Sequence, residues 1–103
     1  MKAIIARKKY DTETAKMIVQ WDNGHFGGHY RRCCETLYKT VNGAYFLHGD
    51  GGAMTQYGRM VGNMRAPGEE IRPLTETEAL DWLQDRGFPD AAEEHFKDQI
   101  QDA

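Results

Sequence analysis

Several residue types on which enzymes and secreted proteins depend are scarce or missing in this chain. Its 103 residues include no serine and only two cysteines, the neighbouring Cys33 and Cys34. A disulfide usually spans roughly 4.4–6.8 Å between Cα atoms, and an ordinary peptide bond holds neighbours about 3.8 Å apart, so this pair does not predict a bridge. A chain without a disulfide framework favours a reducing compartment, and we expect the protein in the cytoplasm.

Long apolar runs are missing as well. No stretch approaches the roughly 18 consecutive apolar residues that predict a membrane-spanning helix. The apolar residues 3–6 are followed at once by charged ones, and this stretch is too short for a secretory signal. We therefore expect a protein that has no membrane partner.

Charge is plentiful but unevenly distributed, and the formal net charge of −3 hides this. Residues 1–74 contain 11 Lys and Arg against 7 Asp and Glu, a balance of +4. Residues 75–103 contain 2 Lys and Arg against 9 Asp and Glu, a balance of −7. Such a split concerns binding partners and solubility rather than the fold.

The clearest structural signal is a hairpin. Asn42-Gly43 lies between two β-rich runs in residues 34–52, and this pair is the strongest short signal for a type I′ turn, which needs positive φ at both positions. A two-residue loop places Tyr38 opposite Leu47, on the same face of the sheet. We expect this hairpin to form the centre of a sheet.

Three further strands are expected around this hairpin. Residues 2–7 contain a short apolar run, and apolar side chains alternate along residues 15–22. We expect these two strands to pair antiparallel with each other. Residues 70–74 predict a short edge strand, because Pro73 cannot donate a hydrogen bond at the centre of a sheet.

Two glycine-containing stretches predict irregular structure. Each glycine costs about 1 kcal/mol in a helix relative to alanine, so residues 25–32 predict a long loop. Residues 53–68 predict a second irregular stretch, with a short helical turn around residues 55–60.

The C-terminal part carries strong helix signals. Thr75 and Glu78 match a capping box, in which the hydroxyl and the carboxylate each bond a backbone amide of the first turn. Gly87 is suited to end this helix. Between these signals lies an apolar stripe, formed by Ala79, Leu80, Trp82 and Leu83.

A second helix is expected to begin at Phe88-Pro89, with Asp90 as its cap. Its apolar residues recur at a spacing of four: Ala92, Phe96 and Ile100.

These elements predict a single α+β domain over residues 1–103, with an antiparallel sheet of four to five strands. Residues 1–74 form mainly strands and loops, and residues 75–103 form an acidic helical part. We expect the C-terminal helices to pack on one face of the sheet through Leu80, Leu83 and Phe96.

A metal site is the first chemical possibility to consider. The spacing of four between His25, His29 and Cys33 aligns ligands only on a helix, and the neighbouring glycines disfavour a helix. Adjacent cysteines also do not match the paired-cysteine knuckle of structural zinc sites. We therefore expect loop histidines and buried thiols, with no metal and no cofactor. The candidate ligands considered are His25, His29, Cys33, Cys34, His48 and Asp50.

Residues 48–52, His-Gly-Asp-Gly-Gly, raise the possibility of catalysis or phosphate binding, since glycine-rich backbone can present amides to an anion. The segment matches no phosphate-loop pattern. A nucleophile would have to be Cys33 or Cys34 with His48 as the base. We favour glycines that let the chain leave the sheet sharply, and we expect no enzyme. A small metal-dependent enzyme is the weakest of three functional alternatives.

The charged surfaces offer two binding hypotheses. A dense carboxylate face on the helices can mimic a nucleic-acid backbone and dock into a basic groove of another protein, and the alternative is an ordinary solvated face. We expect the partner-binding residues to be Asp81, Asp85, Glu93 and Glu94. A basic patch with nearby tyrosines would bind nucleic acid, although the sequence pI of about 5.8 favours solvated strand ends. This patch would consist of Arg7, Lys8, Lys9, Arg31 and Arg32.

Four segments carry a resemblance: residues 10–15 (YDTETA), 21–24 (WDNG), 35–40 (ETLYKT) and 43–52 (GAYFLHGDGG). They resemble a family of small proteins from bacterial mobile elements, a family without established catalytic residues. The likeness extends to residues 71–75 and 79–83, and the loop at 25–33 departs most from the pattern. The resemblance implies a counter-defence protein such as an anti-CRISPR inhibitor, with a CRISPR effector complex as a partner.

Overall fold

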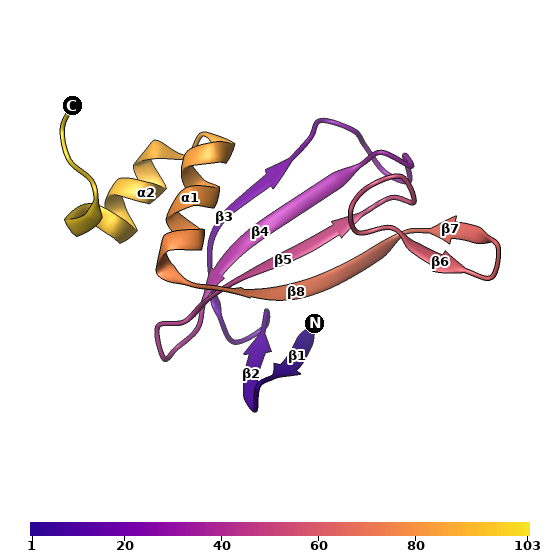
Figure 1. Cartoon of the computed structure of the whole chain (residues 1–103), viewed down its shortest axis with the longest axis horizontal. Helices are drawn as coiled ribbons and strands as arrows, with labels where there is room; N and C mark the ends of the chain where they lie inside the picture. The colour runs from indigo at the N-terminus through magenta and orange to yellow at the C-terminus, as the bar shows by residue number, and fades with distance from the viewer.

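The computed structural model describes residues 1–103 and contains a four-stranded antiparallel sheet with the order β3-β4-β5-β8 (Figure 1). The two central strands form the expected hairpin, and β8 is an edge strand, as Pro73 predicts. The predicted α+β class is confirmed. The strands are β3 (Lys16–Asp22), β4 (Cys33–Lys39), β5 (Tyr45–Gly51) and β8 (Gly68–Leu74).

The register of the central hairpin differs from the prediction. Tyr38 lies opposite Phe46, not Leu47, because the loop has three residues. The Thr40 amide donates to the Ala44 carbonyl at 2.7 Å, and of the loop residues only Gly43 has a positive φ, of 88°. This geometry fits a type I turn followed by a left-handed glycine, the usual three-residue hairpin loop. A shift of one residue in pairing moves Tyr38 to the face opposite Leu47.

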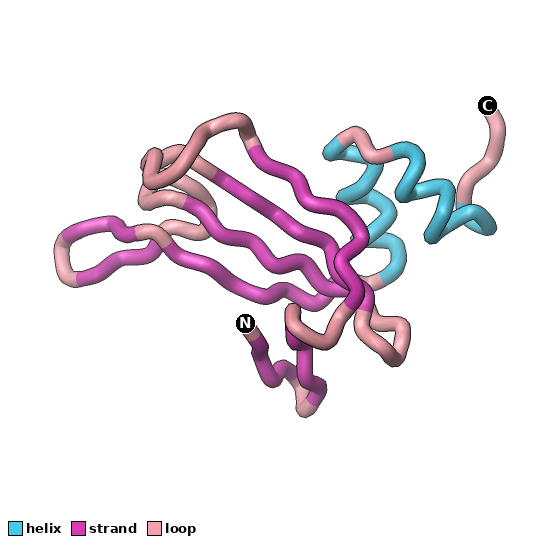
Figure 2. Tube along the Cα trace, turned by 180° about the vertical axis from the view of Figure 1, so that it is seen from behind, coloured by secondary structure: helices cyan, strands magenta, loops and turns pink.

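Two predictions were wrong, the N-terminal strand pairing and the irregular stretch at residues 53–68, because each of these regions contains a separate two-stranded hairpin (Figure 2). The first strand pairs with residues 8–11 rather than with 15–22, through a turn at Ala6-Arg7 whose φ values are 52° and 66°. Ala and Arg seldom adopt positive φ, so the sequence gives no turn signal there. The irregular stretch 53–68 contains a hairpin instead of a helical turn. The new strands are β1 (Lys2–Ile5), β2 (Lys8–Asp11), β6 (Arg59–Val61) and β7 (Met64–Ala66).

Helix α1 (Glu76–Arg86) follows the prediction closely: Thr75 and Glu78 form the capping box, and Gly87 ends the helix at φ 80°. Helix α2 (Pro89–Phe96) begins without a side-chain cap, so Asp90 lies in its first turn and does not cap it. Pro89 has no backbone N–H, so the first turn of α2 has one donor fewer for a cap to bind. A short 3-10 helix, η1 (Lys97–Gln99), follows, and Ile100 is exposed beyond it.

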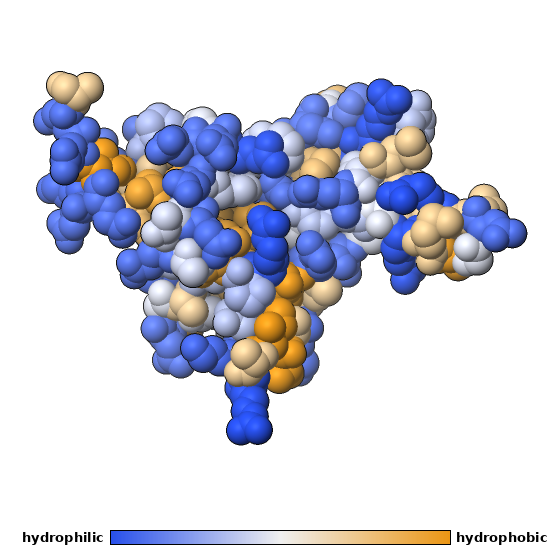
Figure 3. All heavy atoms as spheres, in the orientation of Figure 1, coloured by the Kyte–Doolittle hydropathy of each residue, from blue (hydrophilic) through white to orange (hydrophobic).

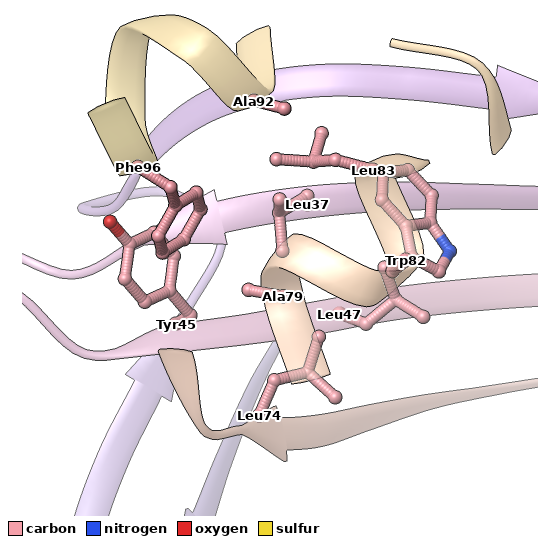
Figure 4. Close-up of a cluster of buried hydrophobic side chains, with 9 residues drawn as sticks. All are labelled: Leu37, Tyr45, Leu47, Leu74, Ala79, Trp82, Leu83, Ala92 and Phe96. Atoms are coloured by element: carbon pink, nitrogen blue, oxygen red, sulfur yellow. The ribbon is translucent and has the colours of Figure 1, made fainter. Parts of the chain in front are cut away.

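The main core lies between the helices and one face of the sheet (Figure 4). Its nine buried residues are Leu37, Tyr45, Leu47, Leu74, Ala79, Trp82, Leu83, Ala92 and Phe96. A smaller cluster of Tyr10, Phe46 and Ile71 covers part of the opposite face beneath the β1–β2 hairpin. None of the helices has the length and apolar character that would let it cross a membrane.

The alternation expected for the strand at residues 15–22 is interrupted. A β-bulge between Met17 and Val19 shifts the register, so Met17 pairs with Tyr38 and Val19 with Leu37. Val19 and Trp21 pack against the main core, whereas Met17 is exposed.

Candidate binding site at the loop end of the sheet

Three segments gather at the end of the sheet that lies farthest from the helices (Figure 1). They are residues 23–32 between β3 and β4, residues 52–58 after β5, and the β6–β7 hairpin, and we call them together the loop end. The Met54 amide donates to the Tyr30 carbonyl at 2.8 Å and joins the first two segments. The Arg65 Nε donates to the Ala53 carbonyl at 2.7 Å and ties the hairpin to the second.

The Asn23 side chain joins the two ends of residues 23–32, the first of these segments. The Asn23 amide nitrogen donates to the Arg31 carbonyl at 2.6 Å, and its oxygen accepts from the Cys33 amide at 3.1 Å. Within the loop, the rings of His25 and His29 stack with centroids 4.4 Å apart, and His29 stacks on Tyr30 at 4.7 Å. The loop therefore has an ordered base and a surface built from aromatic rings.

The loop end has an unusual composition for a protein surface. Residues 23–32 and 52–67 contain four arginines but no lysine, aspartate or glutamate. Figure 3 shows apolar residues gathered over the projecting β6–β7 hairpin. Six of the large apolar side chains that the fold leaves exposed belong to the loop end: Phe26, Tyr30, Met54, Met60, Val61 and Met64. Two of them are almost fully solvated, Phe26 at 85% and Met64 at 74% exposure.

An open cleft of about 690 Å³ lies between the loop end and the adjoining ends of β5 and β8, which contribute Asp50, Glu69 and Glu70 to its lining. Six of its fifteen lining residues are glycines, and two others, Arg32 and Asp50, form an ion pair at 3.0 Å. A Cβ at Gly52 would lie 2.5 Å from the Tyr30 carbonyl oxygen, and one at Gly49 would overlap the ring of Tyr57. The glycines of residues 49–52 thus serve close packing of the loops against the sheet, as the sharp exit of the chain requires.

A buried carboxylate lies beneath the loop end. Glu35 on β4 is 1% exposed, and both of its oxygens accept hydrogen bonds. One oxygen accepts from the Gln56 amide at 3.0 Å and from the Tyr57 hydroxyl at 2.5 Å. The other accepts from the Trp82 indole at 3.0 Å and from the Arg86 guanidinium at 2.7 Å. One side chain therefore joins the central sheet to residues 52–58 and to helix α1.

The network keeps its central carboxylate ionised. Burial by itself raises the pKa of Glu35, but hydrogen bonds from Tyr57, Trp82 and Arg86 outweigh burial and hold that pKa below its usual value. Burial and the adjacent carboxylate raise the pKa of Tyr57, so its hydroxyl stays protonated and can donate a hydrogen bond to Glu35. The Arg86 guanidinium also lies 3.7 Å from the ring centroid of Trp21. We find no buried side-chain nitrogen or oxygen without a partner.

The acidic residues expected to bind a partner lie at the other end of the molecule. Asp81 and Asp85 are one turn apart on α1, and Glu93 and Glu94 are neighbours on α2; all four are exposed. Only Glu93 borders an apolar groove.

The five basic residues of the alternative nucleic-acid patch are divided between two places. Arg7, Lys8 and Lys9 belong to the β1–β2 hairpin, whereas Arg31 and Arg32 belong to the loop end (Figure 1). Arg32 is engaged with Asp50. The fold does not bring the five together.

Apart from the stacked rings of His25 and His29, the candidate metal ligands are not brought together. Cys33 and Cys34 are buried free thiols, and burial raises the pKa of Cys33, which favours its protonated form. Cys34 pairs with Asp50, and His48 pairs with Thr36, so Cys34 and His48 lie on the same face of the sheet with an offset of two residues. The Cys34 sulfur accepts from Gln20, however, and His48 bonds Glu69 at 2.9 Å. No group of three or more His, Cys, Asp or Glu side chains gathers around a common point.

Sequence reasoning missed both the buried network and the loop end. Glu35 stands between apolar and β-branched residues in a strand, and nothing local indicates its partners, which lie 21 to 51 positions away. A signal for the loop end was present, because two separate stretches lack lysine and acids yet carry arginine, methionine and aromatic residues.

No protein-family model, curated protein or solved structure matches the chain.

Proposed function

We propose that the protein is a non-enzymatic protein-binding module whose contact surface is the loop end. The observation that carries this proposal is the composition of that surface. Buried parts of protein interfaces are enriched in aromatic residues, methionine and arginine and depleted in lysine, glutamate and aspartate. Residues 23–32 and 52–67 have this composition, and all of their large apolar side chains except the buried Tyr57 are exposed.

The β6–β7 hairpin is the most prominent part of this surface. Each strand has three residues, with Val61 and Met64 on one face and Met60 on the other. A two-stranded hairpin is marginally stable by itself, so docking against a partner would stabilise it. Methionine side chains are flexible and polarizable, which suits them to fill irregular pockets on another protein.

A pull-down from bacterial lysate tests this surface by comparing a triple variant of the loop end with a double variant that serves as its control. Replacing Phe26, Met60 and Met64 by serine should abolish capture of the partner, because these side chains are among the most exposed large apolar ones of the loop end. The matched control replaces Met17 and Val41 by serine; both are exposed but lie outside the loop end. Equal loss of capture in both variants would contradict the assignment.

We further propose that the partner belongs to a bacterial defence complex in the cytoplasm, as for an anti-CRISPR inhibitor. The resemblance to proteins of mobile elements supports this choice. Expression of the chain in a bacterium with an active RNA-guided defence system should raise the plating efficiency of a targeted phage. Unchanged plating across several such systems would argue against a counter-defence role while leaving protein binding intact.

The acidic helix face is a second contact surface under the same function. A carboxylate face can enter a basic groove of the partner. Changing Asp81, Asp85, Glu93 and Glu94 to lysine should then weaken capture. Unchanged affinity would limit the interface to the loop end.

Nucleic-acid binding is the alternative function, and one observation favours it. The stacked rings of His25, His29 and Tyr30 lie beside Arg31, whose guanidinium carbon is 5.5 Å from the Tyr30 ring centroid. Aromatic platforms with arginine bind single-stranded nucleic acid through stacking and phosphate contacts. Binding of this kind would weaken steeply with salt, and a flat titration at low salt would exclude it.

A further inference from the structure

We propose that copies of this chain associate head to tail, with the β6–β7 hairpin of one copy in the apolar groove between α1 and α2 of the next. The inference uses the loop-end surface of the proposed function but names a different occupant for it. Both halves of the contact are present in one chain.

The groove lies at the helical end of the molecule. It has a volume of about 320 Å³, and the residues that line it include Leu80, Phe88, Pro89, Ala92, Glu93 and Ile100. It belongs to the part of the chain, residues 75–103, whose charge balance is −7. The groove is therefore largely apolar, it has one carboxylate, Glu93, in its lining, and it lies in the acidic part of the chain.

The hairpin has the complementary chemistry. Met60, Val61 and Met64 are exposed and apolar, and Arg59 and Arg65 flank them in the same two strands. No acidic residue occurs between Asp50 and Glu69, the part of the sequence that contains the hairpin. Arg59 and Arg65 donate to the carbonyls of Pro67 and Ala53 in their own chain, which holds their positive charges beside the apolar side chains. Apolar side chains can enter the groove while these charges approach the acidic helical part that contains Glu93, and such complementarity selects one surface for another.

The two surfaces cannot meet within one molecule. The hairpin and the helices occupy opposite ends of the longest axis, which extends 49 Å (Figure 1). A contact between different patches on identical chains leaves one free hairpin and one free groove on every assembly, so it closes into rings or grows into filaments. The contact is small, and interfaces of the lowest size class are weak and transient.

Sedimentation velocity on purified protein tests this directly. The wild-type chain should sediment faster as its concentration rises toward about 1 mM, the range in which weak contacts populate. Met60→Ser with Met64→Ser should weaken association at least tenfold, and so should Glu93→Lys with Ile100→Ser in the groove. A control with Lys8→Gln and Lys9→Gln removes two charges from the other hairpin and should associate like the wild type.

A mixing experiment separates head-to-tail association from any other kind. The hairpin variant retains an intact groove and the groove variant an intact hairpin, so an equimolar mixture should form dimers and no larger species. A wild-type chain that stays monomeric at every concentration would overturn the inference. So would association that survives in either variant alone or is lost in the Lys8 and Lys9 control. These outcomes need no external partner, so they leave the proposed function untouched.

Discussion

Replacing Glu35 by glutamine removes one buried negative charge and keeps the shape of the side chain. The carboxylate accepts five hydrogen bonds, two of them from Arg86 and the others from Gln56, Tyr57 and Trp82. A glutamine offers one acceptor oxygen in place of two, so at least one pair of these donors must rearrange or lose its acceptor.

The magnitude follows from how buried the two charges are. Breaking a fully buried ion pair costs roughly 3–5 kcal/mol, because the remaining charge is left unpaired. The Arg86 side chain is 32% exposed, and water screens part of the loss. We therefore expect Glu35→Gln to lower the free energy of unfolding by about 2–3 kcal/mol, a large share of the roughly 5–15 kcal/mol of a typical domain.

Equilibrium urea unfolding followed by tryptophan fluorescence measures this loss, since Trp82 bonds Glu35 directly. The matched control is Glu70→Gln, because Glu70 is an exposed carboxylate on β8. The control should change stability by no more than about 0.5 kcal/mol. If Glu35→Gln falls in the same range as the control, the network does not stabilise the fold and the reasoning fails.

Three further predictions concern the same architecture. The pKa of Glu35 is lower in the folded chain than in the unfolded chain, so ionised Glu35 stabilises the fold fully above the unfolded value of about 4.3. This stabilisation is lost as pH falls through the folded-state pKa. The free energy of unfolding should therefore fall less steeply with acid in Glu35→Gln than in the wild type. Gly49→Ala should cost about 1–3 kcal/mol in urea unfolding, because the added methyl overlaps the Tyr57 ring, and a neutral result would contradict that packing. Thr75→Ala should cost about 1 kcal/mol and lower helix content by circular dichroism, through loss of the α1 cap, whereas unchanged stability would mean the cap is dispensable.

Local signals predicted those elements whose determinants lie close together in sequence. The capping box of α1, its Gly87 end and the edge position of Pro73 are read within a few residues, and all are present. The same short range explains the errors. The Asn42-Gly43 pair indicates a turn, but the loop length depends on the bonds between Thr40 and Ala44, and the sequence does not reveal this choice.

Long-range features were beyond sequence reasoning for a physical reason. Glu35 is buried only because residues from a loop and a helix arrive around it, and Tyr57 reaches it only because Gly49 leaves room for the ring. The β6–β7 hairpin has strands too short and too exposed for an alternating pattern. The fold places this hairpin and residues 23–32 at the same end of the sheet, and only this arrangement makes its exposed methionines part of a candidate site.

The most direct test of the loop end as the binding surface is site-specific photo-crosslinking in cells. A photoreactive amino acid is placed at Met60 in one variant, at Val41 in a second and at Asp81 in a third; all three positions are exposed. We expect the variant at Met60 to form a covalent complex with one defined protein partner and the variant at Val41 to form none. A complex formed from Asp81 but not from Met60 would contradict the assignment and return the binding surface to the acidic helices.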